Sequence, residues 1–494
     1  MITVWVFGDQ LNRRIGALAE ADPTTHRVLF IQSAHKIASK AWHRQRLHFY
    51  LASMRRFAAE LEQAGFHVDY RIAPTMTEGL RRHIAEHQPT DVIATEPNSL
   101  NARSLLERLG VRTVHSNQFL CHPLDFATFA STRKSFKMED FYRWQRKRLG
   151  LLMNGDEPEG GAWNFDADNR LPPPKNRTWP NPPRDKLDDL DRDVIANLPA
   201  AAWGASPTGW WSTSRNGALA RLEHFVTKLL PDFGPYEDAM LHDDWHLAHS
   251  VLSPYLNNGL LLPGEVVDRV IEAYRAGNVP VNSVEGFVRQ VIGWREFIWN
   301  MYWREMPDMR SANHLGATRE LPPMFLDPSK TKMRCLSQVL NDIDERAWVH
   351  HIPRLMILGN FALTSGIHPW QFTEWMWRSF VDAAEWVMAP NVMGMSLYAD
   401  GGKVATKPYA SGGAYIDKMS DFCKGCHFDR KARVGERACP YTTLYWDFLL
   451  RHHESFVRNP RIAQQVRAAQ KLSDVDEVRM RATGVLGDLD AGRL

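Results

Sequence analysis

The chain has 494 residues, of which 44% are hydrophobic, and its formal net charge is only +3. A chain of this length typically forms two or three domains with large cores. Its small net charge excludes a strong overall electrostatic field, so any affinity for nucleic acid must come from a local basic patch. No apolar run approaches the ~20 residues of a membrane span, and the apolar segment 1–11 is too short and lacks the basic start of a secretory signal, so we expect a soluble, cytoplasmic protein.

The first 150 residues alternate short apolar runs with amphipathic segments such as Ala41–Ala64. This alternation predicts a parallel sheet covered by helices on both faces, a Rossmann-like α/β domain over residues 1–150. The predicted strands are Ile2–Gly8, Arg27–Ser33, His67–Ala73, Asp91–Glu96 and Val111–Ser116. Ligands of such sheets bind beyond the carboxyl ends of the strands, where Asp9 and Gln10 follow the first strand. A G-x-G-x-x-G fingerprint is absent there, so the pattern does not indicate a dinucleotide loop.

A proline-rich stretch divides the chain. Residues 154–186 hold seven prolines among many polar residues, which predicts an extended interdomain linker over residues 151–211. From residue 212 to 494, apolar positions recur at helical spacing, so we predict an all-α carboxy-terminal domain. Its clearest helices are Val284–Tyr302, Ile352–Thr364 and Pro369–Met388, of which the last two have prolines near their starts, as suits a first helical turn.

Four of the five cysteines fall in the last third of the chain. They are Cys335, Cys423, Cys426 and Cys439, whereas Cys121 lies far from them in sequence. Four thiolates can enclose one metal centre, either tetrahedral zinc or an iron–sulfur cluster, and the spacing does not separate the two. A redox pair at the C-x-x-C, or two unrelated buried thiols there, is the alternative. The proline that follows Cys439 favours the iron–sulfur cluster.

Several strings in the helical part resemble those of the photolyase/cryptochrome flavoproteins, and in combination with the cysteines they resemble the bacterial iron–sulfur subgroup. The strings are Ser250–Leu256, Gly293–Phe297, Trp348–Arg354, Ala389–Asn391 and Met395–Gly402. The resemblance covers essentially the whole chain. It implies flavin adenine dinucleotide (FAD) in the helical domain and a [4Fe–4S] cluster in the region of about 330–450.

The resemblance also implies a set of flavin-binding residues. They are Tyr236, Ser250, Val251, Leu252, Ser253, Trp294, Arg295, His351, Arg354, Asp382 and Asn391. Ser250 and Ser253 can donate hydrogen bonds to phosphate, although a helix cap is an equal reading of each serine. Arg295 and Arg354 would form charge-assisted bonds, although a surface salt bridge would also explain Arg354.

Two adjacent histidines are the expected catalytic residues. Neighbours on a helix are ~100° apart, so His350 and His351 cannot share one face and should have different tasks. The resemblance to the iron–sulfur subgroup implies action on (6-4) photoproducts, and this repair needs a proton transfer to the lesion, for which histidine has a suitable pKa. We expect His350 to protonate the lesion and His351 to lie nearer the flavin or to orient its neighbour. One core histidine and one exposed histidine without catalytic roles are the alternative.

Tryptophan is unusually frequent, with 18 residues in the chain, and three are candidates for electron transfer to the flavin: Trp375, Trp377 and Trp386. Stacked core aromatics are the commoner explanation of such residues. Met376 follows Trp375 where relatives are expected to have tyrosine, so a different aromatic residue would complete the path.

The antenna chromophore and the DNA contacts are further expectations from the resemblance. Relatives bind 6,7-dimethyl-8-ribityllumazine in the amino-terminal domain, where Asp9 and Gln10 would line the site, but segment Gln32–Lys36 lacks the expected acidic residue. Trp348, Lys403 and Lys407 are the expected DNA contacts. The basic segment Arg133–Arg148 is either a second DNA contact or a solvated helix face.

The expected function is therefore light-dependent repair of (6-4) photoproducts in UV-damaged DNA by a monomer. In this reaction reduced FAD transfers an electron and a histidine assists with a proton. A blue-light photoreceptor without repair activity and a cyclobutane-dimer photolyase are the alternatives. The histidine pair favours (6-4) repair over the cyclobutane type, but it does not exclude a receptor that keeps an ancestral pocket.

Overall fold

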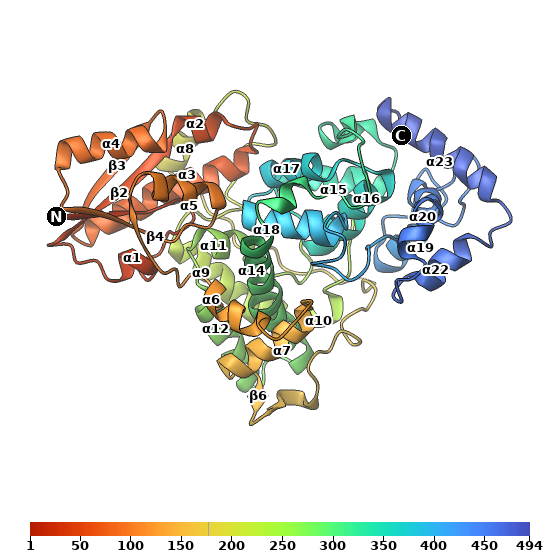
Figure 1. Cartoon of the computed structure of the whole chain (residues 1–494), viewed down its shortest axis with the longest axis horizontal. Coiled ribbons are helices and arrows are strands. Elements are labelled where there is room, and N and C mark those ends of the chain that lie inside the picture. Colours follow the sequence, from red (N-terminus) through yellow and green to blue (C-terminus); the bar gives the residue numbers. More distant parts are fainter. Residues whose placement is uncertain (176) are drawn as a thin grey trace.

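The computed structural model describes residues 1–175 and 177–494. A five-stranded parallel sheet forms the amino-terminal part, at the left of Figure 1. Its strands are β1 (Ile2–Trp5), β2 (His26–Ser33), β3 (His67–Ala73), β4 (Asp91–Thr95) and β5 (Arg112–Val114). The strand order is β3-β2-β1-β4-β5, so the order reverses between β1 and β4. All five predicted strands are confirmed, although the first and the last are shorter than expected.

Both faces of the sheet are buried, as the continuous apolar strands require. In β2, Val28 and Phe30 belong to the large core of the molecule, whereas Leu29 and Ile31 point to a smaller core on the opposite face. This alternation follows from the two-residue period of a strand. The helices of this part are α1 (Gly16–Ala19), α2 (Ala34–Ala38), α3 (Arg44–Gln63), α4 (Met76–His87) and α5 (Leu100–Arg108). Helix α3 contributes Phe57 to the large core, and the opposite core receives Leu80 from α4.

The last helices before residue 150 pack on the helical part of the molecule. They are α6 (Pro123–Ala130) and α7 (Met138–Leu149), and α6 lies against α14 (Glu296–Glu305) in Figure 1. The ring of Phe297 lies 5.8 Å from that of Phe141 and 6.3 Å from that of Phe126, measured between centroids. The segment that follows the sheet therefore already belongs to the interface with the helical part.

The linker is less uniform than its composition predicts. It starts with a short hairpin of β6 (Met153–Asn154) and β7 (Glu157–Pro158) and ends with a helix, α8 (Asp189–Ala196). The expectation of an extended segment throughout 151–211 is wrong for α8, which packs on α3. Its buried Asp191 accepts a hydrogen bond at 3.0 Å from His48 of α3, and Arg56 of α3 forms an ion pair with the same carboxylate. Polar contacts with α3 keep this helix in place, and the composition of residues 151–211 does not predict these contacts.

The remainder of the chain is helical, as predicted. The helices are α9 (Arg215–His224), α10 (Leu230–Tyr236), α11 (Ser253–Asn258), α12 (Pro263–Arg275), α13 (Val281–Val288), α14 (Glu296–Glu305), α15 (Arg334–Arg346), α16 (Asn360–Ser365), α17 (Pro369–Ser379), α18 (Glu385–Ala389), α19 (Gly413–Met419), α20 (Pro440–Arg451), α21 (His453–Phe456), α22 (Ala463–Ala469) and α23 (Val475–Asp490). Four π-helical segments are inserted between them, at Phe225–Leu229, Arg289–Arg295, Pro353–Gly359 and Pro390–Ser396. Such segments occur frequently at functional sites.

The helix expected over Pro369–Met388 is interrupted, and this expectation is wrong in the middle of the segment. Helix α17 ends at Ser379 and α18 starts at Glu385. Between them, the carbonyl oxygens of Phe380, Val381 and Ala383 accept hydrogen bonds from one guanidinium nitrogen of Arg46, at 3.2, 3.3 and 2.5 Å. Because Arg46 belongs to α3, the partner that replaces the helical bonds comes from the other end of the chain.

Candidate functional site

The interrupted segment carries the centre of a buried polar network. Asp382 is 4% exposed and accepts two parallel hydrogen bonds from the guanidinium group of Arg354, both at 3.0 Å. The hydroxyl of Ser253, at the start of α11, donates to the same carboxylate at 2.6 Å. The indole N–H of Trp348 donates to Ser253 at 3.2 Å, and Asn257 donates to the backbone carbonyl of Asp382 at 2.8 Å. Three segments thus meet at Asp382: α11, residues 348–354 and the turn between α17 and α18.

The setting of Arg354 excludes the surface salt bridge considered for it. Its guanidinium lies 4.1 Å from the ring centroid of Phe380 and 5.8 Å from that of Trp348, and its Nε donates to the backbone carbonyl of Val349 at 2.7 Å. A bidentate pair of this kind, flanked by aromatic rings, holds its partners in one geometry. The network therefore sets the relative positions of α11, the π-helical segment Pro353–Gly359 and the α17–α18 turn.

The two adjacent histidines lie in different surroundings, as their helical offset predicts. His350 is 3% exposed and stacks on His249, with ring centroids 4.0 Å apart and planes 21° apart. Burial, together with the neighbouring His249 and His351, lowers the pKa of His350 well below its ordinary value. The side chain of His351, in contrast, is exposed to solvent. Burial and the charge of Arg354 lower its pKa as well.

Several buried polar atoms beside the His249–His350 stack lack a partner among the described residues. They are Nδ1 of His350, Nε2 of His249, Nε1 of Trp245 and Oε2 of Glu237. Burial raises the pKa of Glu237 to about 8, more than the nearby Arg289 lowers it, and burial lowers that of His249 to about 3. Buried polar groups without partners are costly, so the free ring nitrogens of the stacked His249 and His350 fit a ligand that supplies hydrogen-bonding atoms.

Further residues expected around the flavin follow the same segments. Tyr236 ends α10, next to Glu237, and packs on Trp179 with ring centroids 5.6 Å apart. Val251 and Leu252 are buried just before α11, and the hydroxyl of Ser250 accepts the N–H of Leu252 at 3.4 Å. Neither serine is the N-cap of α11, because Leu252 occupies that position without a side-chain bond. The helix-cap explanation of the two serines is therefore wrong.

Arg295 lies in a second cluster, between the helical part and the sheet. It donates to the carboxylate of Glu296 at 2.9 Å and to the carbonyl of Leu256 in α11 at 3.2 Å. Its guanidinium lies 4.1 Å from the ring centroid of Phe119 and 5.4 Å from that of Trp386. Burial raises the pKa of Glu296 to about 7, although Arg295 acts in the opposite direction. Leu256 joins this cluster to the network around Asp382.

Two more of the expected flavin residues sit on π-helical segments. Trp294 is partly buried within Arg289–Arg295, and its ring centroid lies 6.4 Å from that of Phe297. Asn391 is partly buried within Pro390–Ser396, where its side-chain amide donates to the carbonyl of Val387 at 2.8 Å.

The three tryptophans expected to carry electrons lie in three separate groups. Trp375 packs with Phe325 and Phe372, and Trp377 packs edge-on against Trp42 at 6.1 Å. Trp386 instead meets Trp299 of α14, with centroids 5.6 Å apart. The structure thus does not place the three expected tryptophans in one row of neighbouring aromatic rings.

An aromatic chain that the sequence reasoning missed continues from Trp386. The ring of Trp299 lies 5.3 Å from that of Trp303, which is partly buried and carries the guanidinium of Arg103 at 3.6 Å from its centroid. Trp299 and Trp303 are four residues apart on α14, and this spacing on one helix face is the signal that could have identified them. Trp386, Trp299 and Trp303 therefore form a continuous row from the buried interior toward the surface.

The four cysteines of the last third meet around one cavity, as predicted. Cys335 belongs to α15, Cys423 and Cys426 lie between α19 and α20, and Cys439 is the residue before α20. All four line one cavity, and none of them forms a disulfide in the structure. Cys121 is fully buried elsewhere, where its backbone N–H donates to Glu296.

The sulfur atoms are too dispersed for one ion. Nowhere in the described chain do three of these thiols bring their Sγ atoms within 4.8 Å of one another. Four thiolates on one zinc ion at ~2.3 Å would lie about 3.8 Å apart. The donor set and its spread therefore fit a multi-atom cluster with thiolate ligands.

The expected antenna site lies where the strand order reverses. The backbone carbonyl of Asp9 accepts from Gln118 at 2.7 Å, its carboxylate accepts from Asn98 at 3.1 Å, and Gln10 donates to the carbonyl of Glu96 at 2.9 Å. Burial raises the pKa of the Asp9 carboxyl despite nearby Lys36 and Arg46. Ligands of doubly wound sheets bind at this point.

The residues expected to contact DNA also make contacts within the protein. Trp348 is 4% exposed within the network around Asp382, and Lys403 forms an ion pair with Glu305 at 2.5 Å. Lys407 lies over the ring of Tyr409 at 5.8 Å. In the basic segment, Arg146 is fully buried and donates to backbone carbonyls, so this part of Arg133–Arg148 is structural.

Comparisons with known proteins agree with this fold and identify the family. A family described as "Deoxyribodipyrimidine photo-lyase-related protein" matches residues 4–206. A protein of Agrobacterium fabrum named "(6-4) photolyase" is 39% identical over 504 aligned positions, which cover 99% of each chain. The chain belongs to the photolyase/cryptochrome family.

Solved structures show the same fold at low sequence identity. The crystal structure of a bacterial class III photolyase from Agrobacterium tumefaciens matches with a TM-score of 0.61 at 17% identity, covering 99% of this chain and 98% of that chain. A cryptochrome from Synechocystis sp. PCC6803 matches with a TM-score of 0.55 at 14% identity, covering 99% and 94%. In the described residues, none of the helices has the length and apolar character needed to cross a bilayer.

The ion pair of Arg354 and Asp382 should dominate the stability of the site. Asp382→Asn leaves a buried guanidinium without its counter-charge, which typically costs about 3–5 kcal/mol. Asp193→Asn removes the partner of Arg55 in a pair with an exposed carboxylate and is the matched control, with an expected cost below about 1 kcal/mol. Thermal unfolding of the three proteins checks this. Equal midpoints for the two variants would contradict the role assigned to the pair.

Proposed function

We propose that this chain is a light-driven lyase that repairs (6-4) pyrimidine photoproducts in UV-damaged DNA. The observation that carries the proposal is the 39% identity to the Agrobacterium fabrum protein named "(6-4) photolyase" across 99% of both chains. The buried polar network, the histidine pair and the cysteine cavity support it, because each lies on a string through which the sequence resembles this family. The expectations of a monomer and of a cytoplasmic location remain predictions.

FAD would bind beside the histidines, and when bound in its reduced form it would supply the photoexcited electron. The unpartnered atoms of His249, His350 and Glu237 offer hydrogen-bonding groups to such a ligand. Arg354 and Asp382 would hold the pocket wall and neutralise each other there. The remaining expected contacts, Tyr236, Ser250, Trp294, Arg295 and Asn391, stay proposals.

The burial of the histidines favours a reversal of the expected division of labour. His350 is enclosed in its stack with His249, whereas His351 is accessible and can meet a lesion flipped out of the duplex. We assign the proton transfer to His351 and the positioning of the pocket to His350. The group that gives the proton is the imidazolium form of His351, which returns to neutral imidazole, and because burial and Arg354 lower the pKa of His351, repair should rise as the pH falls.

The four clustered cysteines would hold a [4Fe–4S] cluster. This cluster would join α15 to the segment between α19 and α20, and its binding energy would count as folding energy. At the sheet edge, 6,7-dimethyl-8-ribityllumazine remains the proposed antenna at Asp9 and Gln10. Glu385 of α18 lies close enough to Lys36 to affect its pKa and is a candidate for the acidic residue missing after the second strand. Lys403 and Lys407 remain the proposed phosphate contacts.

Illumination of the purified protein with DNA that carries either lesion tests the proposal. We expect restored bases from the (6-4) product and none from the cyclobutane dimer, as measured by chromatography of the digested DNA. Restoration of the cyclobutane dimer instead would assign the chain to the other repair class. Photoreduction without any repair would support a receptor.

The roles of the two histidines can be separated within the same assay. His351→Ala should lower repair per absorbed photon by about 10²–10⁴-fold, the usual effect of removing a general acid, while the flavin content stays normal. His350→Gln keeps a polar side chain of similar size in the buried position and should retain most of the repair. An inactive His350→Gln together with a near-normal His351→Ala would restore the assignment of proton transfer to His350.

Photoreduction should follow the row of Trp386, Trp299 and Trp303. Trp299→Phe should slow the light-driven reduction of the flavin by an external reductant at least about tenfold, because it interrupts the row in the middle. Trp375→Phe is the control, since Trp375 packs among phenylalanines in another group. If only Trp375→Phe slows the reaction, the electrons take the path expected from the sequence.

The cysteine cavity predicts the metal content. The purified protein should contain about four iron and four acid-labile sulfide per chain, with zinc near background. Cys335→Ser should lower both contents and the yield of folded protein, whereas Cys121→Ser should change neither, because Cys121 lies outside the cavity. Stoichiometric zinc without iron would contradict the cluster.

A further inference from the structure

Two histidines and a glutamate converge at the carboxyl edge of the sheet, outside the sites described above. Glu96 directly follows β4, His115 follows β5, and His122 is the residue before α6. The Nε2 atom of His122 lies 3.0 Å from one carboxylate oxygen of Glu96, and Nδ1 of His115 lies 3.3 Å from the other. The two ring nitrogens are 3.3 Å apart. Three metal-binding atoms from three segments thus face one another.

We propose that Glu96, His115 and His122 form a binding site for a divalent transition metal ion, with zinc as the best-matched ion. Ligand atoms bound to one zinc ion at ~2.0–2.1 Å with tetrahedral or slightly smaller angles lie about 2.9–3.4 Å apart. The two ring nitrogens lie 3.3 Å apart, and each lies 3.0–3.3 Å from a different oxygen of Glu96, so a small rotation of the carboxylate would bring one oxygen within this range of both nitrogens. Two imidazole nitrogens and one carboxylate are also a donor set that borderline metal ions prefer.

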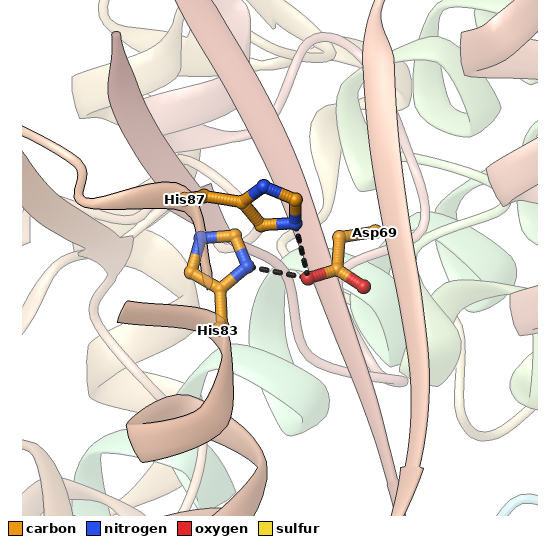
Figure 2. A group of neighbouring side chains, drawn as sticks. All are labelled: Asp69, His83 and His87. Carbon is orange, nitrogen blue, oxygen red and sulfur yellow. Dashed lines mark hydrogen bonds and ion pairs between the residues drawn. The ribbon is translucent and has the colours of Figure 1, made fainter. Parts of the chain in front are cut away.

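A second cluster of the same composition shows what distinguishes this one. Figure 2 shows His83 and His87 directed at a single carboxylate oxygen of Asp69. Nδ1 of His83 approaches this oxygen to 2.5 Å, which is a hydrogen bond and leaves no room for an ion between them. Arg71 donates to the same oxygen, also at 2.5 Å, so a cation already occupies the place. The second cluster is therefore an ion-pair network.

Glu96 has no such competitor. Within the described part of the chain, it pairs with neither lysine nor arginine, and its ion-pair partners are the two histidines. The backbone N–H of Ser116 donates to the carboxylate at 3.1 Å and orients it from behind, as groups around metal ligands commonly do. Burial raises the pKa of the Glu96 carboxyl, but the Ser116 and His122 hydrogen bonds outweigh this effect and lower it, so the ligand is ionised.

The cluster leaves one side open for further ligands. Glu96, Ser116 and His122 line a small cavity together with Arg103, Trp299 and Trp303. A water molecule or small anion in this cavity would complete a tetrahedral shell. His115 is largely exposed, so an ion can enter from solvent without an opening of the fold.

Metal binding would shift one proton within His122. At present its Nδ1 accepts the N–H of Leu124 at 3.3 Å as part of the cap of α6. A metal on Nε2 takes the lone pair there, so the ring proton moves to Nδ1 and this long bond is given up. The other half of the cap remains, because Asp125 accepts the backbone N–H of His122 at 3.2 Å.

The position of the site suggests a structural role. The segment between His115 and His122 carries Gln118, which donates to Asp9, and Phe119, whose ring stacks on Trp299 at 3.9 Å with nearly parallel planes. A metal that binds both ends of this segment and the end of β4 would hold it against the sheet and the helical part. The ion would therefore stabilise the contact between the two halves of the molecule.

Calorimetric titration of zinc into the full-length protein in metal-free buffer tests the proposal. The wild type should bind one zinc ion with low-micromolar affinity or better. His115→Ala, which changes an exposed side chain, and His122→Asn, which keeps a residue suited to cap α6, should each weaken this binding at least about tenfold, since even changes to groups that only orient a ligand commonly cost that much. His87→Ala in the Asp69 cluster is the matched control and should bind like the wild type.

Thermal unfolding gives a second reading that is independent of other zinc sites on the chain. Zinc should raise the unfolding midpoint of the wild type and of His87→Ala, but not that of His115→Ala or His122→Asn, because the ion binds the folded form. The proposal is overturned if the wild type binds no zinc, if both site variants bind it normally, or if His87→Ala removes it. Wild-type binding that persists in the site variants would place the zinc at the cysteines or another surface site.

Discussion

The ion pair between Arg354 and Asp382 is the interaction on which the rest of the site depends. It joins a π-helical segment to the turn between α17 and α18, and Ser253 and Asn257 tie α11 to the same aspartate. A buried pair adds little net stability compared with apolar packing, but it is costly to break and admits one geometry. Its value here is positional, because a light-driven electron transfer needs the donor, the pocket wall and the proton-bearing group at set distances.

Arg46 extends this dependence to the other half of the molecule. Its guanidinium lies on α3, beside the sheet, and donates to three carbonyls of the turn that holds Asp382. The turn is therefore formed jointly by a residue of the first 50 and residues near 380. Phe119 adds a second connection, because it lies between Trp299 and the guanidinium of Arg295. The two halves are thus coupled by polar and aromatic contacts close to the proposed pocket.

The row of Trp386, Trp299 and Trp303 lies at this same contact between the halves. It ends beside the cavity that Glu96 and His122 line, at the edge of the sheet. A metal ion at that edge would hold the segment that carries Phe119 without taking part in the light-driven chemistry. The interface would then be organised from the inside by Arg46 and Arg295 and from the outside by the metal.

The sequence by itself determined the order of the parts and the chemistry of the most distinctive residues. Strand-length apolar runs predicted the parallel sheet, helical spacing predicted the helical part, and the four late cysteines predicted a shared centre that the cavity around them supports. The strings around Ser253, His350 and Arg354 indicated the family. The strands and helices follow from neighbouring residues, and the cysteines have a chemistry that few other sites would explain.

Only the tertiary structure decided which groups face one another. It interrupted the helix expected through residue 382, enclosed His350 while leaving His351 accessible, and joined Trp386 to Trp299 and not to Trp375. The physical reason is the same in each case. The spacing of residues along a chain predicts which side chains share a face of one element. The group that bonds to a carbonyl or a carboxylate, or packs on a ring, comes from a segment tens to hundreds of residues away, and spacing does not predict it.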